Sequence, residues 1–204
     1  MKYFCYLLVT FLLTGNNLSA QVYAGIKTGG GVATEKWKDA DPYPARAVWY
    51  GGLLVHIDIN DKFFFQPELL YSLRGYHRNA DAGGNVAATV GYGYLSVPLL
   101  AGYKPVKNLS IMLGPEAGYM LFARSHFSGT TNNFTENINY RFSIDATAGA
   151  ALAVTQKLAI EARMVLGITP LYRGIKTDQF GGNEEIIRSG RNRVLQVGLT
   201  YRLN

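Results

Sequence analysis

The feature that most constrains this chain is an alternation of apolar and polar residues with a period of two. In residues 47–59 the odd positions run from Ala47 to Ile59 and are apolar or glycine, whereas the even positions include His56 and Asp58. Successive side chains of a β-strand point to opposite faces, so the pattern indicates strands with one apolar and one polar face. Its recurrence predicts eight strands, near residues 22–29, 47–59, 63–74, 92–104, 109–121, 141–154, 158–169 and 195–203.

The lengths of the connections predict the architecture. Three connections are short, at 60–61, 105–108 and 155–157, and four are long and polar, near 30–45, 76–90, 125–140 and 173–190. Short and long connections alternate strictly, so all long loops lie at one end of an up-and-down meander. An even strand number with short turns at one end and long loops at the other is typical of a transmembrane β-barrel, whose closure leaves no strand edge facing lipid. We therefore expect an all-β fold, an eight-stranded antiparallel up-and-down transmembrane β-barrel.

A soluble eight-stranded barrel would show the same alternation with its faces reversed, and composition separates the two. Only 17% of residues are charged and 23 are glycine, and the polar face is mostly Gly, Ser, Thr and Ala, which suits a narrow, filled lumen. The strands are also long enough to cross a bilayer, which takes roughly 9–11 tilted residues. Aromatic residues lie toward the strand ends, as interfacial girdles do: Trp49, Phe63, Phe65, Tyr103, Tyr119 and Tyr201. These features favour the membrane barrel.

The first 20 residues read as a secretory signal peptide. Lys2 precedes an apolar run from Tyr3 to Leu13, and the small residues Ser19 and Ala20 follow at a typical cleavage site. A transmembrane helix needs about 20 apolar residues, and this run is shorter. The alternative to a signal peptide is a buried N-terminal strand. We expect cleavage after Ala20, a barrel domain over residues 21–204, and a place in the bacterial outer membrane with both termini in the periplasm. Cys5, the one cysteine, lies in the signal segment, so no cysteine chemistry is expected in the barrel.

Four sequence blocks resemble the PorT-like outer-membrane β-barrel family. They are residues 66–72 (QPELLYS), 94–100 (YLSVPLL), 113–119 (LGPEAGY) and 196–202 (QVGLTYR). The resemblance implies an eight-stranded barrel of the bacterial outer membrane, and one branch of the family assists a protein secretion system. The chain departs from the family at Ser96, where an acidic residue is common, and at its last residue, Asn204, where the family has an aromatic.

Charged residues on the inward face form the first candidate site. Three carboxylates share this face with three cations: Glu68, Glu116, Glu161, Lys27, Arg163 and Arg202. An unpaired carboxylate in a water-poor interior is costly, so we expect ion pairs. One interpretation is a plug that fills the barrel, and the other is a charged constriction for a small solute. Eight strands leave an interior that side chains fill, so general porin activity is not expected.

A basic rim at the long-loop end is the second candidate site. Nine of the eleven arginines fall there: Arg46, Arg74, Arg78, Arg124, Arg141, Arg173, Arg188, Arg191 and Arg193. Arginine pairs bidentately with phosphate, so the rim could hold lipopolysaccharide phosphates. The alternative is a solvated loop face balanced by acidic residues: Glu35, Asp39, Asp41, Glu184 and Glu185. Either interpretation explains the net charge of +6 without nucleic acid.

Prolines inside the proposed strands are an irregularity that the barrel must accommodate. Pro67, Pro98, Pro115 and Pro170 each remove a hydrogen-bond donor from a strand. Pro98 and Pro115 fall at nearly the same height on neighbouring strands, so we expect a local bulge across the third to fifth strands. The interpretation is a set of bends that curve the wall, and the alternative is a lateral gate.

Motifs for enzymatic chemistry are weak. His56, His77 and His126 have no metal-ligand spacing, and the adjacent Ser125 and His126 would point to opposite faces of a strand. The segment 27–31 (KTGGG) has neither the preceding glycine nor the following helix of a phosphate loop. We expect no catalytic residues, cofactor or metal site.

The sequence therefore predicts a non-enzymatic integral outer-membrane barrel with a structural or surface-interaction role through four long loops. The alternatives are an accessory component of a protein secretion or transport system and, as a third, a lipid-modifying hydrolase. The expected partners are outer-membrane lipid and lipopolysaccharide, the barrel-assembly machinery during insertion, and a protein partner at the loops. Nucleic acid is not expected.

Overall fold

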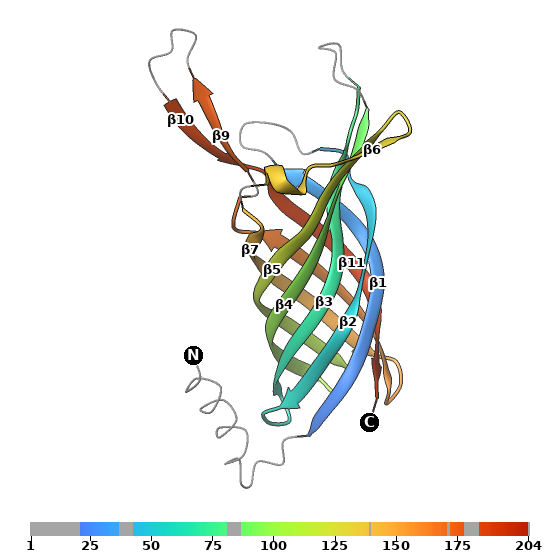
Figure 1. The fold of residues 1–204 in the computed structure, drawn as a ribbon. Helices are drawn as coiled ribbons and strands as arrows, with labels where there is room; N and C mark the ends of the chain where they lie inside the picture. The colour runs from blue at the N-terminus through green and yellow to red at the C-terminus, as the bar shows by residue number, and fades with distance from the viewer. Residues whose placement is uncertain are drawn as a thin grey trace, which may run out of the picture.

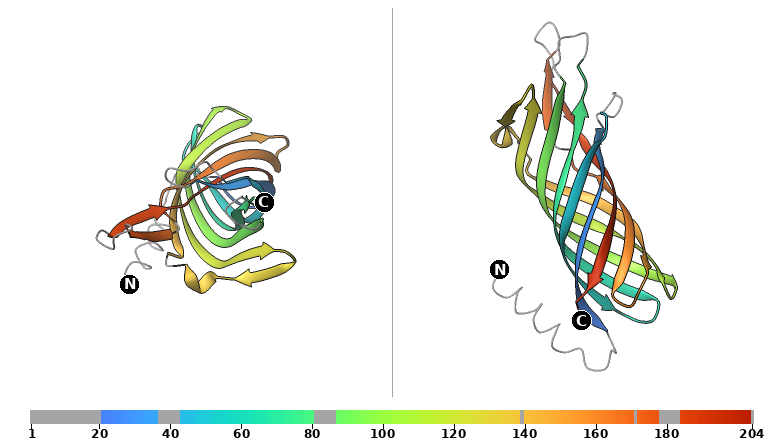
Figure 2. Two further views of the ribbon diagram at one scale, coloured as in Figure 1. Left: turned by 90° about the horizontal axis from the view of Figure 1, so that it is seen from above. Right: turned by 90° about the vertical axis from the view of Figure 1, so that its right-hand side faces the viewer.

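Eight long strands form one closed antiparallel sheet in the computed structural model, which describes residues 21–36, 43–80, 87–138, 140–170, 172–177 and 184–203. The barrel strands are β1 (Val22–Lys36), β2 (Arg46–Asp58), β3 (Phe63–Arg78), β4 (Ala88–Val106), β5 (Leu109–Phe127), β7 (Phe142–Ala153), β8 (Leu158–Gly167) and β11 (Arg191–Arg202). Each pairs with the next, and β11 returns to pair with β1, from Gly25 opposite Arg202 to Lys36 opposite Arg191 (Figures 1 and 2). The prediction of an eight-stranded, antiparallel up-and-down barrel is confirmed.

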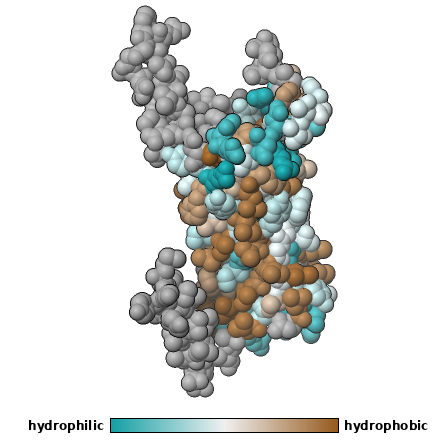
Figure 3. All heavy atoms as spheres, in the orientation of Figure 1, coloured by the Kyte–Doolittle hydropathy of each residue, from teal (hydrophilic) through white to brown (hydrophobic). Residues whose placement is uncertain are grey.

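The apolar face of the sheet points outward. Leu53, Leu113 and Leu195 are among the exposed large apolar side chains, and on the side of the wall seen in Figure 3 the middle is mostly brown, with polar side chains above it. All six aromatic residues expected in the girdles are exposed on this face. A soluble barrel would bury this face, and so large an exposed apolar surface requires lipid around it.

The short turns are built by side chains that cap the backbone. Asn60 Oδ1 accepts hydrogen bonds from the backbone N–H groups of Lys62 (2.9 Å) and Phe63 (2.8 Å) between β2 and β3. Thr155 Oγ1 accepts from Lys157 (3.2 Å) and Leu158 (3.0 Å) between β7 and β8. Such local side-chain hydrogen bonds stabilise tight turns, so the positions of these turns can be predicted from the sequence.

At the opposite end the strands run further than the alternation predicts. β1 continues to Lys36, β4 begins at Ala88 and β5 ends at Phe127, so parts of the segments expected to be loops are strand. The segment near 125–140 holds β6 (Thr130–Asn133), paired with β5, and a 3₁₀ turn (Thr135–Asn137); that near 173–190 holds a hairpin of β9 (Tyr172–Thr177) and β10 (Glu184–Ser189) (Figure 1).

The expected bulge at the prolines is not found. Pro67 lies opposite Leu99 and Pro98 lies opposite Glu116, and the register is the same on both sides of each proline. The irregularities of the β4–β5 pair lie elsewhere, between Gly93 and Tyr94 and near Tyr103. The missing N–H groups interrupt the pairing for about two residues but do not shift it.

Residues 1–20 lie outside the described residues, so the signal peptide and the place of Cys5 remain predictions. Within the described ranges no helix is long and apolar enough to cross a membrane.

Candidate functional site

Four of the predicted inward charges meet in one network, the lower ion cluster, made by Lys27, Glu68, Glu161 and Arg163. Lys27 Nζ lies 2.6 Å from Glu68 Oε1 and 2.8 Å from Glu161 Oε2. Arg163 Nη1 lies 2.8 Å from Glu68 Oε2. All four side chains are at most 3% exposed, and they come from β1, β3 and β8, across the width of the lumen. Two cations therefore neutralise two carboxylates inside the barrel.

The lower ion cluster also uses neutral partners. Gln66 Nε2 donates to Glu68 Oε1 (2.7 Å), and Arg163 Nε donates to Gln196 Oε1 (2.8 Å). The guanidinium of Arg163 lies over the ring of Tyr50, 4.7 Å from its centroid. Tyr50 fits only because Gly198 faces it: a Cβ there would lie 2.3 Å from the Tyr50 hydroxyl. Glycines on the inward face thus make room for the large side chains that hold the charges.

Arg74, Glu116 and Asp145 form a second network, the upper ion cluster. Arg74 Nη1 lies 2.7 Å from Asp145 Oδ2, and Nη2 lies 2.7 Å from Glu116 Oε1. Thr147 donates to Glu116 (2.7 Å) and Ser143 donates to Asp145 (3.1 Å). The assignment of Arg74 to the rim is therefore wrong. β3 extends to Arg78, four residues beyond Arg74, so the Arg74 side chain stays inside the barrel.

Glu35, expected on a solvated loop face, is fully buried at the upper end of β1. Tyr92 donates its hydroxyl proton to Glu35 Oε2 at 3.2 Å, and Oε1 has no hydrogen-bond partner in the described part of the chain. Its neighbour in register on β11, Asn192, is also buried. Glu35 thus belongs to the interior and does not balance the rim.

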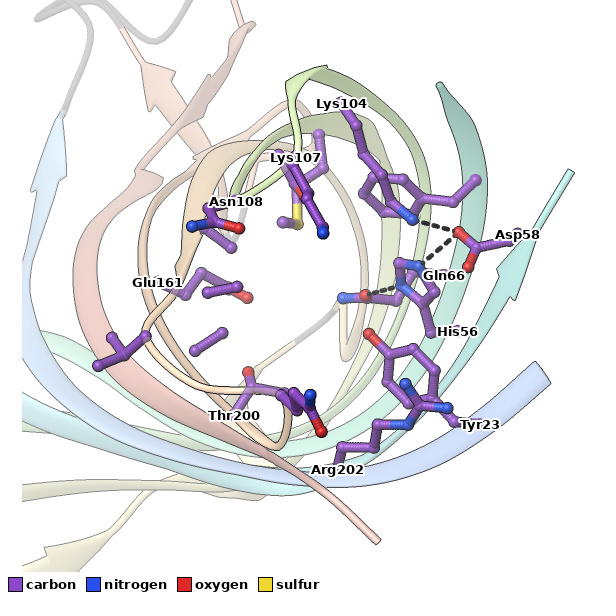
Figure 4. Close-up of a pocket in the computed structure, with 18 of the residues that line it drawn as sticks. Tyr23, His56, Asp58, Gln66, Lys104, Lys107, Asn108, Glu161, Thr200 and Arg202 are labelled. Carbon is purple, nitrogen blue, oxygen red and sulfur yellow. Dashed lines mark hydrogen bonds and ion pairs between the residues drawn. The ribbon is translucent and has the colours of Figure 1, made fainter. Parts of the chain in front are cut away.

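Arg202 lies apart from both ion clusters, at the short-turn end of the lumen. Its guanidinium lies 4.3 Å from the centroid of the Tyr23 ring, and it lines a cavity of about 620 Å³ that also contacts Glu161 of the lower ion cluster (Figure 4). The six predicted lumen residues therefore divide into four in the lower ion cluster, Glu116 in the upper one, and Arg202 at the cavity.

The other rim arginines divide between the wall and the loops. Arg46 donates to the carbonyl of Val90 (2.8 Å), and Arg141 donates to the carbonyl of Thr135 (3.2 Å). Arg78 is partly buried in the upper part of β3, and Arg124 is exposed, over the ring of Phe122. Arg191 and Arg193 are exposed on the outward face of β11. The side chains of Arg173 and Arg188 lie outside the described part of the structure.

The three histidines contact hydroxyl, amide and carboxylate groups of neighbouring side chains. His77 Nδ1 lies 2.9 Å from Thr89 Oγ1, and His126 Nδ1 lies 3.0 Å from Thr131 Oγ1. His56 bonds Gln66 and Asp58 inside the barrel. Among the described residues, no three His, Cys, Asp or Glu side chains gather as a metal site would require.

Sequence reasoning missed Asp145 and the lumen position of Arg74, although the signal was present. Both residues fall on the polar face of their alternating segments. It also missed the group formed by His56, Asp58 and Lys104, whose members come from two strands that are not neighbours. Only the barrel's curvature brings them together, and the alternation carries no information about it.

Comparison with known proteins agrees with this architecture. The family model described as outer membrane protein beta-barrel domain matches residues 13–173. Among solved structures, Neisserial surface protein A is similar with a TM-score of 0.59 and 10% identity, covering 90% of this chain and 99% of that one. Ail, the attachment invasion locus protein of Yersinia pestis, solved with the heparin analogue sucrose octasulfate, has a TM-score of 0.51 and 13% identity, covering 90% and 99%.

No curated protein matches the chain in sequence. The similarity to the solved structures establishes the fold, and the family match covers most of the chain. The short turns of such barrels face the periplasm and the longer loops face the outside. The chain belongs to the outer membrane protein beta-barrel domain family and is a protein of the bacterial outer membrane.

Proposed function

We propose that this protein is a closed, non-enzymatic barrel that is held in the lipopolysaccharide leaflet by basic residues and presents its extracellular strands to partners at the cell surface. The observation that carries the proposal is the contrast between the two parts of the sheet. Side chains of the two ion clusters occupy the lumen, whereas β4, β5 and β6 continue at the long-loop end, above the apolar band (Figures 1 and 3). That extension is not needed to cross a bilayer, so it serves contacts outside it.

A group of outward cations supports the lipopolysaccharide contact. Lys36 and Arg191 are direct partners in the β1–β11 pair, and Arg193 lies two residues further along β11. We call these three residues the outer basic patch. They are exposed, and Val32 and Leu195 on the same face continue the apolar band below them. Cations at the edge of the hydrocarbon layer lie at the height of lipid phosphates, which arginine binds bidentately.

The lipopolysaccharide contact is tested by urea unfolding in vesicles prepared with and without lipopolysaccharide. A ligand that binds only the folded state raises the unfolding midpoint, so lipopolysaccharide stabilises the native barrel. The Arg191→Gln/Arg193→Gln variant loses most of that increase, whereas Lys62→Gln/Lys157→Gln, at the periplasmic end, retains it. An equal increase in both variants contradicts the outer basic patch as the contact.

Presentation at the surface is tested by labelling a cysteine introduced at the tip of the β5–β6 hairpin. Ser128→Cys places a thiol in the two-residue turn, and Asp61→Cys places one in the β2–β3 turn at the opposite end. A membrane-impermeant maleimide labels position 128 on intact cells and position 61 only after the outer membrane is permeabilised. The reverse labelling contradicts the orientation on which the proposal depends.

The resemblance to PorT-like barrels supports a second candidate, an accessory role in protein secretion. A deletion strain distinguishes the two. Loss of specific proteins from the secreted fraction, restored by the native chain, favours the accessory role. An unchanged secreted fraction together with altered surface contacts favours the first proposal.

A further inference from the structure

The periplasmic end of the lumen holds an open cavity of about 620 Å³, which we call the vestibule (Figure 4). Its inner end is closed by Gln66 and Glu161, which belong to the network around the lower ion cluster. On one side it is lined by small side chains of β5, β7 and β8: Ser110, Ala151, Ala153 and Ala159. These residues leave the space that larger side chains fill higher in the barrel. Its volume lies within the roughly 300–1,000 Å³ of small-molecule sites.

The opposite wall of the vestibule is a column of stacked rings. Tyr23 stacks on His56 with centroids 4.6 Å apart and planes 18° apart, and His56 stacks on Phe64 at 4.3 Å and 27°. Cations lie at both ends of the column: Arg202 over Tyr23 at 4.3 Å and Lys104 over Phe64 at 5.6 Å. The column thus crosses β1, β2 and β3, and its three rings line this wall of the cavity.

The charge of the vestibule is positive. Among the described residues, Lys104, Lys107 and Arg202 are the cations that line it, and Asp58 and Glu161 are the carboxylates. Glu161, the other lining carboxylate, is balanced within the lower ion cluster by Lys27 and Arg163. With Glu161 balanced in this way, the described side chains that line the vestibule carry three cations and one carboxylate, a formal net charge of +2. A cleft lined by one sign of charge concentrates ligands of the opposite sign.

The cations differ in how they are held. Asp58 Oδ1 forms an ion pair with Lys104 Nζ at 2.5 Å and lies 3.1 Å from His56 Nε2. These two contacts hold Lys104 beside the ring column. Lys107 lies in the exposed β4–β5 turn and points into the opening (Figure 4). Within the described residues no carboxylate lies within ion-pair distance of Lys107. Lys107 in this turn and Arg202 on β11 both line the cavity.

We propose that the vestibule is a binding site for a small polyanion from the periplasm, a molecule with at least two carboxylate or phosphate groups. Lys107 and Arg202 bind the acidic groups, Arg202 bidentately. Lys104, held by Asp58, adds a third positive charge, and the ring column packs against the ligand's carbon skeleton. The lower ion cluster closes the site on the inner side, so the ligand enters and leaves from the periplasm.

Titration of the full barrel domain in detergent micelles, followed by calorimetry, tests this site with two probes. Citrate represents carboxylate chemistry and inorganic pyrophosphate represents phosphate chemistry, and the difference between their affinities identifies which chemistry the site prefers. Lys107→Gln weakens binding of the preferred probe by about tenfold, and the Lys107→Gln/Arg202→Gln variant abolishes measurable binding. Because Lys107 lies in an exposed turn, the single variant retains the fold, which heat-modifiable migration verifies.

The matched control is Lys62→Gln/Lys157→Gln, which removes two cations at the same end of the barrel but outside the vestibule. This control binds the preferred probe within about twofold of the native affinity. Equal weakening in the control and vestibule variants shows attraction to the general surface charge and overturns the proposal. So does a dissociation constant weaker than about 1 mM for both probes.

Discussion

At the scale of single residues, the interior is specified by a small number of buried charges. Arg74 is 2% exposed and joins two carboxylates that lie on β5 and β7. Taking such ions out of water costs several kcal/mol each, and the cost is offset only when every charge is paired and hydrogen-bonded. Thr147 and Ser143 supply the remaining bonds of Glu116 and Asp145. The upper ion cluster therefore depends on its one cation.

Replacing that cation gives the first prediction. Arg74→Leu leaves Glu116 and Asp145 buried beside each other with no cation, so we expect the free energy of unfolding to fall by about 3–5 kcal/mol. Arg124→Leu, which removes an exposed arginine on β5, changes it by less than about 0.5 kcal/mol. Reversible urea unfolding in phospholipid vesicles measures both. A loss in Arg74→Leu no larger than in Arg124→Leu contradicts an essential role for the upper ion cluster.

At the scale of elements, the sequence predicts the strands best where they cross the membrane. There each outward position must be apolar, so the alternation from Leu109 to Leu121 is regular and shows the strand directly. Above the membrane that requirement ends. Residues 34–36 of β1 are polar, and the three glycines at 29–31, below them, have no side chain that could show the alternation. The upper half of β1 therefore resembles a loop, although it pairs with β2 and β11.

The sequence likewise predicts one part of the candidate site, namely which charged side chains face inward, but not which of them meet. Alternation alone assigns Lys27, Glu68 and Glu161 to the inward face, because facing depends on local sequence. Which charges meet depends on the stagger between strands and on strand length, which a single segment does not encode. The position of Arg74 near an expected strand end therefore predicts a rim location that the longer β3 excludes, and only the register between β1 and β11 brings Lys36 and Arg191 of the outer basic patch together.

Close packing between neighbouring strands gives the second prediction. A Cβ on Gly102 of β4 would lie 1.9 Å from Phe64 Cζ on β3, so Gly102 leaves the space that the Phe64 ring occupies in the vestibule wall. Gly102→Leu therefore lowers the free energy of unfolding by about 1–3 kcal/mol. Gly51→Leu is the matched control, because a Cβ there meets no atom closer than 3.5 Å.

A second substitution verifies the cause. Adding Phe64→Ala to Gly102→Leu removes the clash, so the double variant is more stable than the sum of the two single effects implies. Because residues 64 and 102 lie on different strands, a change in the local backbone at residue 102 does not explain such a coupling between the two substitutions. Strict additivity of the two effects in urea unfolding contradicts the packing argument.

At the scale of the whole molecule, the barrel separates three environments. Its outward face is apolar and meets lipid, its extracellular end carries the outer basic patch, and its periplasmic end opens into the positive vestibule. Between the two ends lie the lower and upper ion clusters, whose side chains come from β1, β3, β5, β7 and β8. A path through the lumen must therefore pass two layers of paired charges.

This arrangement predicts that the barrel conducts no ions. The native chain inserted into a planar bilayer produces no current steps, whereas a 16-stranded porin in the same bilayer conducts readily. Because the two layers lie in series, the Arg74→Leu variant, with the lower ion cluster intact, also stays closed, even though it is less stable. Steady current through the native protein would show a continuous aqueous path and refute the closed lumen. Current through Arg74→Leu alone would show that the upper ion cluster is the one barrier.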